Sequence, residues 1–381
     1  MQPYRITRRR LGAYAMGLAA APAVFAQNGV DARQVLVGQF AAFSGPASQL
    51  GERLKLGIEA YFKTVNGQGG VHGRQLKLVA RDDGYEPDRA KAAVKQLIEQ
   101  DQVFALIGAV GTPTGIAAVP LLTEAKVPIV GLFTGAEALR EPFNRYVFHV
   151  RASYYEETER IVQHLTSLGL RKIAVFYQND AYGKAGLEGV ERAMARRQLK
   201  VAALGTVERN SVDVNAALAA LLPGMPEAIV QISAYKSCAA FIKQARAKGY
   251  GGQFFNVSFV GSKALADELG DMGAGVVITQ VVPFPYAGST AIVREYQQVM
   301  TEAGHKEHDF SSMEGFLTAK VFVEGMKRAG RSLTRDGLIA AIETITDWDM
   351  GGFSVRYGPK DHTGSSYVDV STIVRGGRFM R

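Results

Sequence analysis

The 381-residue sequence contains a single cysteine, Cys238, so no disulfide can form within the chain. Beyond the N-terminus it lacks the run of about 18 apolar residues that a membrane-spanning helix requires. It also lacks a stripe of lysine and arginine with interleaved aromatic residues, which argues against nucleic-acid binding. With 21% charged and 47% hydrophobic residues, the composition is that of an ordinary globular protein that is stable by packing alone. We expect Cys238 to be a buried small hydrophobe.

Motifs of common enzyme classes are absent as well. The sequence has no G-x-S-x-G elbow, no G-x-x-x-x-G-K-[ST] loop and no C-x-x-C pair. The histidine cluster at 305–309 falls in a polar stretch between two expected helices, where a solvated loop is favoured over a metal site. Asp82 and Asp83 follow an expected strand, where aspartate more often orders the next turn than serves in catalysis. We therefore expect no enzymatic activity, no cofactor and no metal.

The first 26 residues have the pattern of a signal peptide. Four arginines without any acidic residue precede apolar residues 11–24, and Val24-Phe25-Ala26 offers small residues at a cleavage position. About 14 apolar residues are too few to span a bilayer. Residues 7–11 loosely resemble a twin-arginine signal, and ordinary secretion explains the segment equally well. Cleavage would begin the mature chain at Gln27 and lower its formal charge from +8 to +4.

Residues 35–83 form the most informative segment, because they combine a β-α-β pattern with specific turns. The pattern comprises a short apolar strand, a Ser-Gly-Pro turn, a helix with apolar residues at helical spacing, a glycine-rich corner and a second strand, at 35–38, 44–46, 54–65, 66–74 and 76–79. The second strand ends at Asp82-Asp83. Such a unit crosses over right-handed in almost all proteins.

Alternating strands and helices continue through two further runs. The apolar strand 103–108, a helix at 116–123 and a strand at 127–130 belong to the first run, which ends near Arg151. A second run starts at Tyr155 and contains expected strands at 172–177, 201–207, 228–232, 253–257 and 275–279. Because the chain is longer than one core normally supports, we predict two doubly wound α/β lobes.

The spacing of S-G-P-x-x-x-x-G at 44–51, N-G-x-G-G-x-x-G-R at 66–74 and Asp82-Asp83 resembles the periplasmic leucine/isoleucine/valine-binding protein family. These are type I solute-binding proteins of ABC transporters, and the resemblance covers nearly all of the mature chain. It implies the type I periplasmic binding protein fold, with two Rossmann-like lobes and a multi-strand hinge crossed three times. The implied lobes are 33–150 with 280–346, and 151–279 with 347–381.

The same resemblance implies a periplasmic protein that binds a small solute by lobe closure. The solute would be a carboxylate-bearing or polar metabolite, either an amino acid or a related organic acid. The implied partner is an inner-membrane ABC permease, with no nucleic acid and no membrane insertion of the mature chain. A ligand-sensing receptor for a signalling partner is the alternative within this architecture. An α/β enzyme is the alternative from another class, because a fold does not determine a function.

Two junctions in the first lobe are candidates for carboxylate binding. Gly111 and Thr112 lie between a buried strand and a helix, where free main-chain N–H groups and a hydroxyl suit an anion, although an ordinary capped turn has the same residues. In the resembled family a Ser or Thr at the Thr112 position binds the ligand carboxylate. Thr134 or Gly135 matches the second carboxylate donor of the family. Phe133 would pack on the ligand or belong to the core.

The second lobe contributes the other candidates. Tyr182 matches a family position whose ring closes over the ligand, which suits an aromatic side chain with a polar tip. Arg151 and Tyr155 lie where the chain enters the second lobe, and Arg151 would either pair with an anion or brace the hinge. Tyr235 follows an expected strand and is a candidate for the wall of the cleft.

Two residues depart from the amino-acid-binding pattern of the family. Ser258 stands where those proteins have a glutamate that holds the ligand ammonium, and Leu50 stands where tyrosine or tryptophan is common. Serine supplies no negative charge, and a buried unpaired ammonium is unfavourable. Either another acid takes over the role, or the ligand has no α-ammonium. The candidate acids are Asp180, Glu156 and Glu314.

Overall fold

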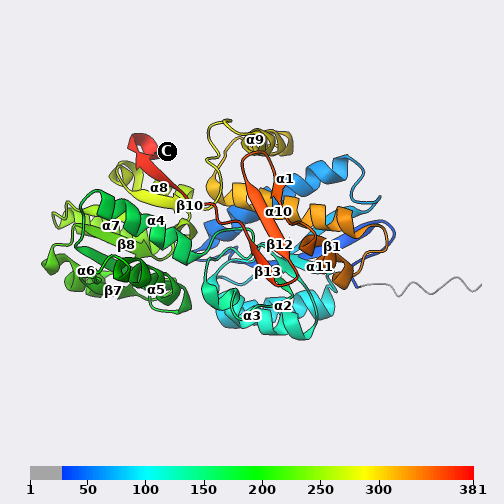
Figure 1. The fold of residues 1–381 in the computed structure, drawn as a ribbon, viewed down its shortest axis with the longest axis horizontal. Coiled ribbons are helices and arrows are strands. Elements are labelled where there is room, and N and C mark those ends of the chain that lie inside the picture. The colour runs from blue at the N-terminus through cyan, green and yellow to red at the C-terminus, as the bar shows by residue number, and fades with distance from the viewer. Residues whose placement is uncertain (1–27) are drawn as a thin grey trace, which may run out of the picture.

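The computed structural model describes residues 28–381, so the expected signal peptide at 1–26 lies outside the described residues. Two α/β lobes lie side by side (Figure 1). The first lobe contains the blue, cyan and orange segments, and the second contains the green segments and the red C-terminal strand. The predicted architecture of two wound lobes is confirmed. Among residues 28–381, no helix is both long and apolar enough to cross a bilayer.

The first lobe is built on a parallel five-stranded sheet with the order β2-β1-β3-β4-β5. Helices α1 and α10 pack together on one face, and α2 and α3 pack on the other (Figure 1). The strands are β1 Gln34–Ala41, β2 Gln75–Asp82, β3 Ala105–Ile107, β4 Ile129–Val130 and β5 Val147–Phe148. The helices are α1 Ser48–Gly67, α2 Pro87–Lys95, α3 Thr112–Glu124, α9 Ala291–Ala303, α10 Phe310–Ala329 and α11 Arg335–Glu343.

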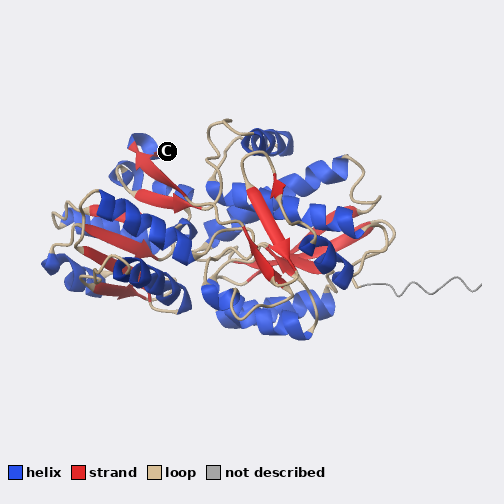
Figure 2. Cartoon of the chain, viewed as in Figure 1, coloured by secondary structure: helices blue, strands red, loops and turns tan. Residues whose placement is uncertain are grey.

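The second lobe is built on a seven-stranded sheet with the order β15-β14-β10-β9-β8-β6-β7. Its central strands are parallel and almost fully buried, as expected for strands covered by helices on both faces, which Figure 2 shows in blue around the red strands. The strands are β6 Ile173–Gln178, β7 Leu204–Val207, β8 Ala228–Ile232, β9 Gln253–Asn256, β10 Val277–Gln280, β14 Asp369–Val374 and β15 Arg378–Met380. The helices are α4 Tyr154–Ser167, α5 Ala181–Ala195, α6 Asn215–Leu221, α7 Tyr235–Ala247 and α8 Ser262–Leu269.

Short helical turns connect several of these elements. A π-helical turn extends α2, and single 3₁₀ turns mark the loops of both lobes. They are η1 Gln96–Gln100, η2 Glu137–Leu139, η3 Leu222–Gly224, η4 Ser258–Val260, η5 Gly270–Gly273 and η6 Arg375–Gly377. The turn η4 matters most for the site, because it projects from the end of β9 toward the first lobe.

A small antiparallel sheet lies against the first lobe. The expected lobe boundary at 347 had placed its residues in the second lobe. Its strands are β11 Trp348–Asp349, β12 Ser354–Gly358 and β13 Asp361–Gly364. The main-chain N–H of His149 donates to the carbonyl of His362 at 2.9 Å, and the Tyr357 hydroxyl donates to the carbonyl of His149 at 2.7 Å. Of the segment 347–381, only β14 and β15 join the sheet of the second lobe. The boundary was misplaced because short glycine-rich strands do not reveal which sheet they join.

Helices α1 and α10 touch backbone to backbone through two glycines. A Cβ atom on Gly57 of α1 would collide with the carbonyl oxygen of Ser312 and lie 2.8 Å from the main-chain nitrogen of Phe316. A Cβ atom on Gly315 of α10 would collide with the carbonyl oxygen of Leu54. Since neither helix backbone can yield locally, this contact sets the distance between α1 and α10.

The chain crosses between the lobes three times. The first crossing follows β5, the second follows β10, and the third joins β13 to β14. The third crossing lies between the other two, because it is bonded to both. His149, just before the first crossing, bonds to His362, and β10, just before the second crossing, pairs with β14, with Gln280 opposite Asp369. The predicted hinge of several strands is therefore present.

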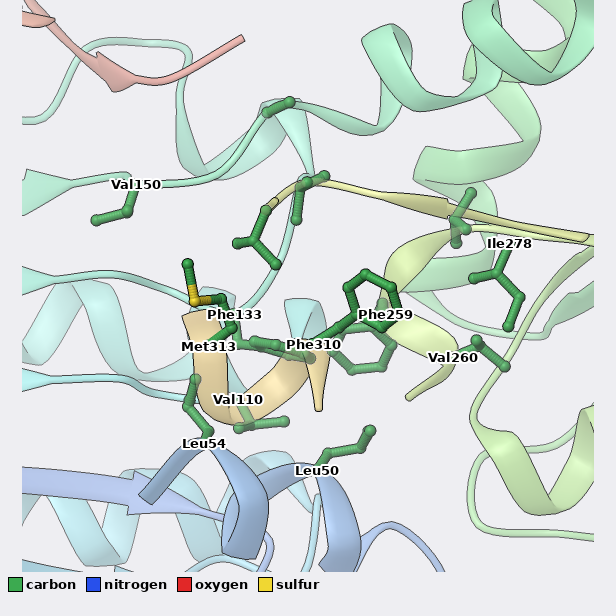
Figure 3. Packing of buried hydrophobic residues seen from close by; sticks show 14 of the residues in the cluster. Leu50, Leu54, Val110, Phe133, Val150, Phe259, Val260, Ile278, Phe310 and Met313 are labelled. Atoms are coloured by element: carbon green, nitrogen blue, oxygen red, sulfur yellow. The ribbon is translucent and has the colours of Figure 1, made fainter. Parts of the chain in front are cut away.

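Apolar side chains from both lobes meet in a continuous cluster. Val110, Phe133 and Met313 of the first lobe and Phe259 and Val260 of the second belong to it, and Figure 3 shows them together. Leu50 at the start of α1 also takes part, since its Cδ2 would lie 2.5 Å from a Cβ atom on Gly261 across the interface. The two lobes are thus in contact, and the structure is that of the closed form.

The Ser-Gly-Pro turn after β1 is ordered by Asp82 at the end of the neighbouring strand β2. The Asp82 carboxylate accepts hydrogen bonds from the Ser44 hydroxyl at 2.5 Å and the Phe43 main-chain N–H at 2.8 Å. Although burial opposes the effect, these bonds lower the pKa of Asp82 to about 2. Asp82 therefore has a structural role, as the turn chemistry of aspartate predicts.

Candidate functional site

Two threonines meet at the carboxyl ends of neighbouring strands of the first lobe. Thr112 begins α3 after β3, and Thr134 follows β4, and their hydroxyl oxygens lie 2.6 Å apart although 22 residues separate them. Both side chains are fully buried. The first turn of a helix leaves main-chain N–H groups without partners inside the helix. Hydroxyls and N–H groups converge here in an arrangement that suits a carboxylate.

Glycines on either side of this pair allow other groups to approach closely. Gly111 has a φ of +106°, and a Cβ atom there would collide with the ring of Tyr85. A Cβ atom on Gly135 would lie 2.6 Å from the main-chain nitrogen of Tyr154, whose N–H donates to the Gly135 carbonyl at 2.7 Å. Any side chain at Gly111 or Gly135 would therefore displace an aromatic residue of the site.

A cluster of buried rings joins the lobes beside the threonines. Phe259 in η4 lies with its ring centroid 5.6 Å from Phe133, 5.9 Å from Tyr85 and 4.5 Å from Tyr182. Tyr154 lies 5.4 Å from Tyr182, and its hydroxyl accepts a hydrogen bond from Thr134 at 3.3 Å. Phe133 and Phe259 appear in Figure 3 at the centre of the apolar contact. The threonine hydroxyls thus lie at the edge of an aromatic enclosure.

Arg151 lies at the first crossing and is surrounded by two carboxylates. Its Nη2 lies 3.5 Å from Glu157 Oε1 and donates to the Ser258 hydroxyl, and its Nε lies 3.6 Å from Glu314 Oε1. The guanidinium carbon lies 4.8 Å from the centroid of the Phe133 ring, in a cation–π geometry. Although burial opposes it, Glu314 and Glu157 raise the pKa of Arg151. Arg151 therefore remains charged.

The two carboxylates beside Arg151 differ in how they are satisfied. Glu157 accepts from the Ser258 main-chain N–H at 2.7 Å and from the Thr279 hydroxyl at 2.6 Å. Glu314 forms the ion pair with Arg151, and its side chain makes no hydrogen bond within residues 28–381. Burial, opposed by Arg151, raises the pKa of Glu314 to about 7. Glu314 thus has fewer partners that stabilise its ionised form than Glu157 has.

Several buried polar atoms at the lobe interface have no hydrogen-bond partner within the described chain. They include Nη1 of Arg151, Oη of Tyr182, Oε1 of Gln178 and Oδ2 of Asp83. Burial raises the pKa of Asp83 to about 7. Buried polar atoms are normally paired, so a group of unpaired ones at one interface indicates a place where a polar molecule binds.

Two predicted residues lie away from the threonine pair and Arg151. Tyr155 points to the outer side of the second lobe, where Arg192 lies 4.2 Å from its ring centroid. Its neighbour Tyr154 takes the inward position, because consecutive residues of a helix face directions about 100° apart. Tyr235 is buried at the start of α7 and lines a shallow pocket with Ser48 and Gln49, separate from the threonines. The remaining predicted residues lie around the threonine pair or Arg151: Gly111, Thr112, Phe133, Thr134, Gly135, Arg151, Tyr182 and Ser258.

Two of the acids considered as ammonium partners have structural roles instead. Asp180 caps α5 by accepting from the Tyr182 main-chain N–H at 2.9 Å. Glu156 forms a capping box with Ser153, in which its side chain accepts from the Ser153 main-chain N–H at 2.7 Å. Glu314 is the only one of the three that lies beside Arg151.

A polar contact bridges the lobes at the rim of the interface. Arg209 of the second lobe lies 2.8 Å from Glu86 of the first and 3.2 Å from Asp180. Asn210 donates to the same Glu86 carboxylate at 2.8 Å and to the Gly84 carbonyl at 3.1 Å. We call Arg209, Asn210 and Glu86 the rim latch. Because these groups belong to different lobes, the latch forms only when the lobes are closed.

Sequence reasoning missed four residues of the site: Tyr85, Tyr154, Glu157 and Phe259. Tyr85 lies in the loop after β2 and Phe259 lies in the turn η4 after β9, and only the meeting of the two lobes makes them neighbours. Glu157 lies six residues after Arg151. Because a crossing and the start of a helix lie between them, this spacing does not predict an ion pair. Tyr154 was available as a signal, because Ser153 and Glu156 have the spacing of a capping box, which starts the helix at Tyr154.

Comparison with known proteins gives a consistent result. Residues 34–378 match the model of a family described as periplasmic binding protein. A Leu/Ile/Val-binding protein homolog 7 of Brucella abortus (strain 2308) is 25% identical over 245 residues, which is 62% of this chain and 60% of that protein. The match thus spans less than two thirds of that relative.

Two solved structures are similar over nearly their whole length. A possible leucine/isoleucine/valine-binding protein from Rhodopirellula baltica SH 1 is 37% identical, with a TM-score of 0.87, and the match covers 91% of this chain and 95% of that one. A substrate-binding periplasmic protein from Ralstonia solanacearum is 30% identical, with a TM-score of 0.82 and coverage of 89% and 97%. These findings confirm the family resemblance inferred from residues 35–83.

Proposed function

We propose, because this chain belongs to the periplasmic binding protein family, that it captures a small carboxylate-bearing solute between its lobes. The mature protein acts in the periplasm and delivers the solute to an ABC permease of the inner membrane. No covalent step is part of this function. The family membership carries the general function, and the proposed solute class comes from the residues of this chain.

One observation supports the proposed solute class above all others. The hydroxyls of Thr112 and Thr134 lie 2.6 Å apart at the start of a helix, in a fully buried position. Such a group of donors can surround a carboxylate without any lysine or arginine, because hydrogen bonds to an ionised acceptor are strong. The ligand carboxylate is proposed to take its hydrogen bonds from the main-chain N–H groups that begin α3 and from these hydroxyls, which would then donate to the ligand instead of to each other and to Tyr154.

Closure of the lobes provides the mechanism of capture. The first lobe binds the carboxylate, and the second lobe then brings Tyr182 and Phe259 over the rest of the molecule. A ligand shifts the balance between open and closed forms only through the contacts that it gains in the closed form. The rings supply those contacts by burying apolar area, and the rim latch adds polar ones.

A thermal-shift screen of the mature protein tests the proposal directly. A ligand that binds only the folded state raises stability by mass action, by about 2.7 kcal/mol at a hundredfold excess over Kd. We expect a carboxylate-bearing metabolite to raise the melting temperature and an equivalent amide, which lacks the charge, to have little effect. Stabilisation by the amide as strong as by the acid would contradict carboxylate recognition.

Thr112→Val tests the role of the threonine pair. The change keeps the side-chain volume nearly constant and removes the hydroxyl, so we expect the solute identified by the screen to bind about 1–3 kcal/mol more weakly. Isothermal titration calorimetry measures this loss. Thr166→Val is the matched control, since that hydroxyl only bonds back to carbonyls of its own helix α4, such as that of Val162. Equal affinities for both variants would remove Thr112 from the site.

Arg209→Gln tests the rim latch. The latch is partly exposed, with 24% of the Arg209 side chain accessible, so its contribution to closure is on the order of 0.5–1 kcal/mol. We expect affinity to fall about two- to fivefold at low salt and the difference to shrink as ionic strength rises. Arg197→Gln, which breaks a pair with Glu159 inside the second lobe, is the control. A loss of affinity that is the same for both variants would exclude a role of the latch in closure.

A further inference from the structure

Within residues 28–381, no free carboxylate lies around Ser258, where the family resemblance implies the partner of a ligand ammonium. Glu157 lies in the right region, but its two oxygens already accept three hydrogen bonds: 2.7 Å and 3.0 Å from Ser258, and 2.6 Å from Thr279. It also lies 3.5 Å from Arg151. A carboxylate with these partners has little remaining capacity for a further cation.

The other nearby carboxylate is also unsuited to an ammonium. Glu314 lies 3.6 Å from the Nε of Arg151 and is only 5% exposed. With its pKa raised to about 7, mainly by burial, it is a weak source of negative charge at neutral pH. Both Arg151 and Glu157 act on the hydroxyl of Tyr154, and Glu157 also acts on that of Tyr182. An ammonium beside the tyrosines would therefore lie close to the buried guanidinium of Arg151, and the carboxylate of Glu157 nearby is already bonded to Ser258 and Thr279.

What this region offers instead is a set of donors. Nη1 of Arg151 and Oη of Tyr182 are fully buried and have no hydrogen-bond partner among residues 28–381. Both groups border the same cluster of rings. Arg151 lies over Phe133, and Phe259 contacts both Phe133 and Tyr182. A guanidinium has donors only, and a tyrosine hydroxyl donates well, so both are suited to an acceptor oxygen.

We propose that the solute is an organic acid without an α-ammonium, whose second polar group presents an acceptor oxygen to Arg151 and Tyr182. A 2-oxo acid and a dicarboxylic acid both belong to this class, and an α-amino acid does not. The inference rests on the proposed function, because it assigns the carboxylate of the same solute to Thr112 and Thr134. It agrees with a serine at position 258, where the family resemblance implies a glutamate, since the serine hydroxyl binds Arg151 and Glu157 rather than a ligand cation.

The test uses the mature wild-type protein and a metabolite extract of its own host. A sulfonic cation-exchange resin at acid pH retains amine-bearing molecules and lets organic acids pass, and an anion exchanger then separates those acids from neutral compounds. Each of the three fractions is scored by the shift in melting temperature and by mass spectrometry of the bound solute. We expect the organic-acid fraction to stabilise the protein.

The possible results separate the inference from the function on which it rests. Stabilisation by the amine-bearing fraction alone would overturn the inference and leave carboxylate capture intact. Stabilisation by the neutral fraction alone would contradict the proposed carboxylate and the inference with it. Stabilisation by no fraction would contradict solute capture as a whole.

Tyr182→Phe tests the contact with the acceptor oxygen. Removing a hydroxyl that has no partner should leave the melting temperature of the free protein unchanged or slightly raised. If that hydroxyl donates to the solute, affinity for the bound acid should fall about 5- to 20-fold. Tyr286→Phe is the control, because its hydroxyl is also buried without a partner among residues 28–381 but lies beside Phe310 and Phe379. Unchanged affinity of the Tyr182 variant would overturn the proposed contact.

Discussion

Replacement of Arg151 by methionine is expected to lower the stability of the protein by about 3–5 kcal/mol, which is typical when one partner of a buried ion pair is removed. The change leaves Glu157 and Glu314 buried without their shared cation. Removing a buried charge partner is more harmful than never having the pair, because the desolvated carboxylates remain. Urea unfolding followed by circular dichroism measures the loss.

The pH dependence of the Arg151 variant gives a second readout. Without the guanidinium, the pKa values of Glu157 and Glu314 in the folded protein should rise further above those of the unfolded chain. A carboxylate with a raised folded pKa contributes stability that is lost as pH increases through that pKa. We therefore expect the variant to be more strongly destabilised at pH 8 than at pH 5.5. Arg197→Met, at a partly exposed pair with Glu159, should change stability by less than about 1 kcal/mol. Equal losses at both arginines would contradict this account.

Gly57→Ala is expected to be the most harmful of the small substitutions, with a loss of about 3 kcal/mol, at the upper end of overpacking effects. The added methyl group would enter the space of the Ser312 carbonyl oxygen on α10. A backbone atom cannot move aside as a side chain does, so the two helices must separate. That separation disturbs the packing of Leu54 and Phe316, which belong to the same core.

The matched control lies on the same helix. Gly67 at the end of α1 has open space where a Cβ atom would lie, with no atom within 4 Å, and alanine favours helices over glycine by up to about 1 kcal/mol. Gly67→Ala should thus leave stability unchanged or slightly higher. Thermal unfolding of both variants measures the difference. Similar melting temperatures for the two would show that α1 and α10 can move apart without loss.

Local patterns along the chain predicted the elements that carry the site. The expected strand at 228–232 coincides with β8, and the junctions after β3 and β4 lie where alternating strands and helices placed them. Thr112 and Thr134 were both expected to bind the ligand carboxylate, and adjacent parallel strands end at one edge of a sheet. Their 2.6 Å contact follows from that topology.

The remaining features depend on contacts that no local pattern contains. Phe259 reaches Phe133 only because η4 projects across the crevice. The hydrogen bond between Ser258 and Glu157 could not be predicted from the sequence, because 101 residues separate the two. Arg151 was expected either to pair with an anion or to brace the hinge. It lies at the first crossing between two carboxylates of the chain, Glu157 and Glu314, and its pairing with a solute anion stays a proposal.

The three crossings decide what kinds of motion the lobes have. One tether would leave a lobe free to swivel, whereas three connections arranged in a row, with the β13–β14 segment in the middle, permit bending about one line only. Opening and closing therefore follow a single bending coordinate. Each closure brings the same faces into the same alignment, so a solute of the wrong shape prevents full closure, because the lobes have no second way to pack around it.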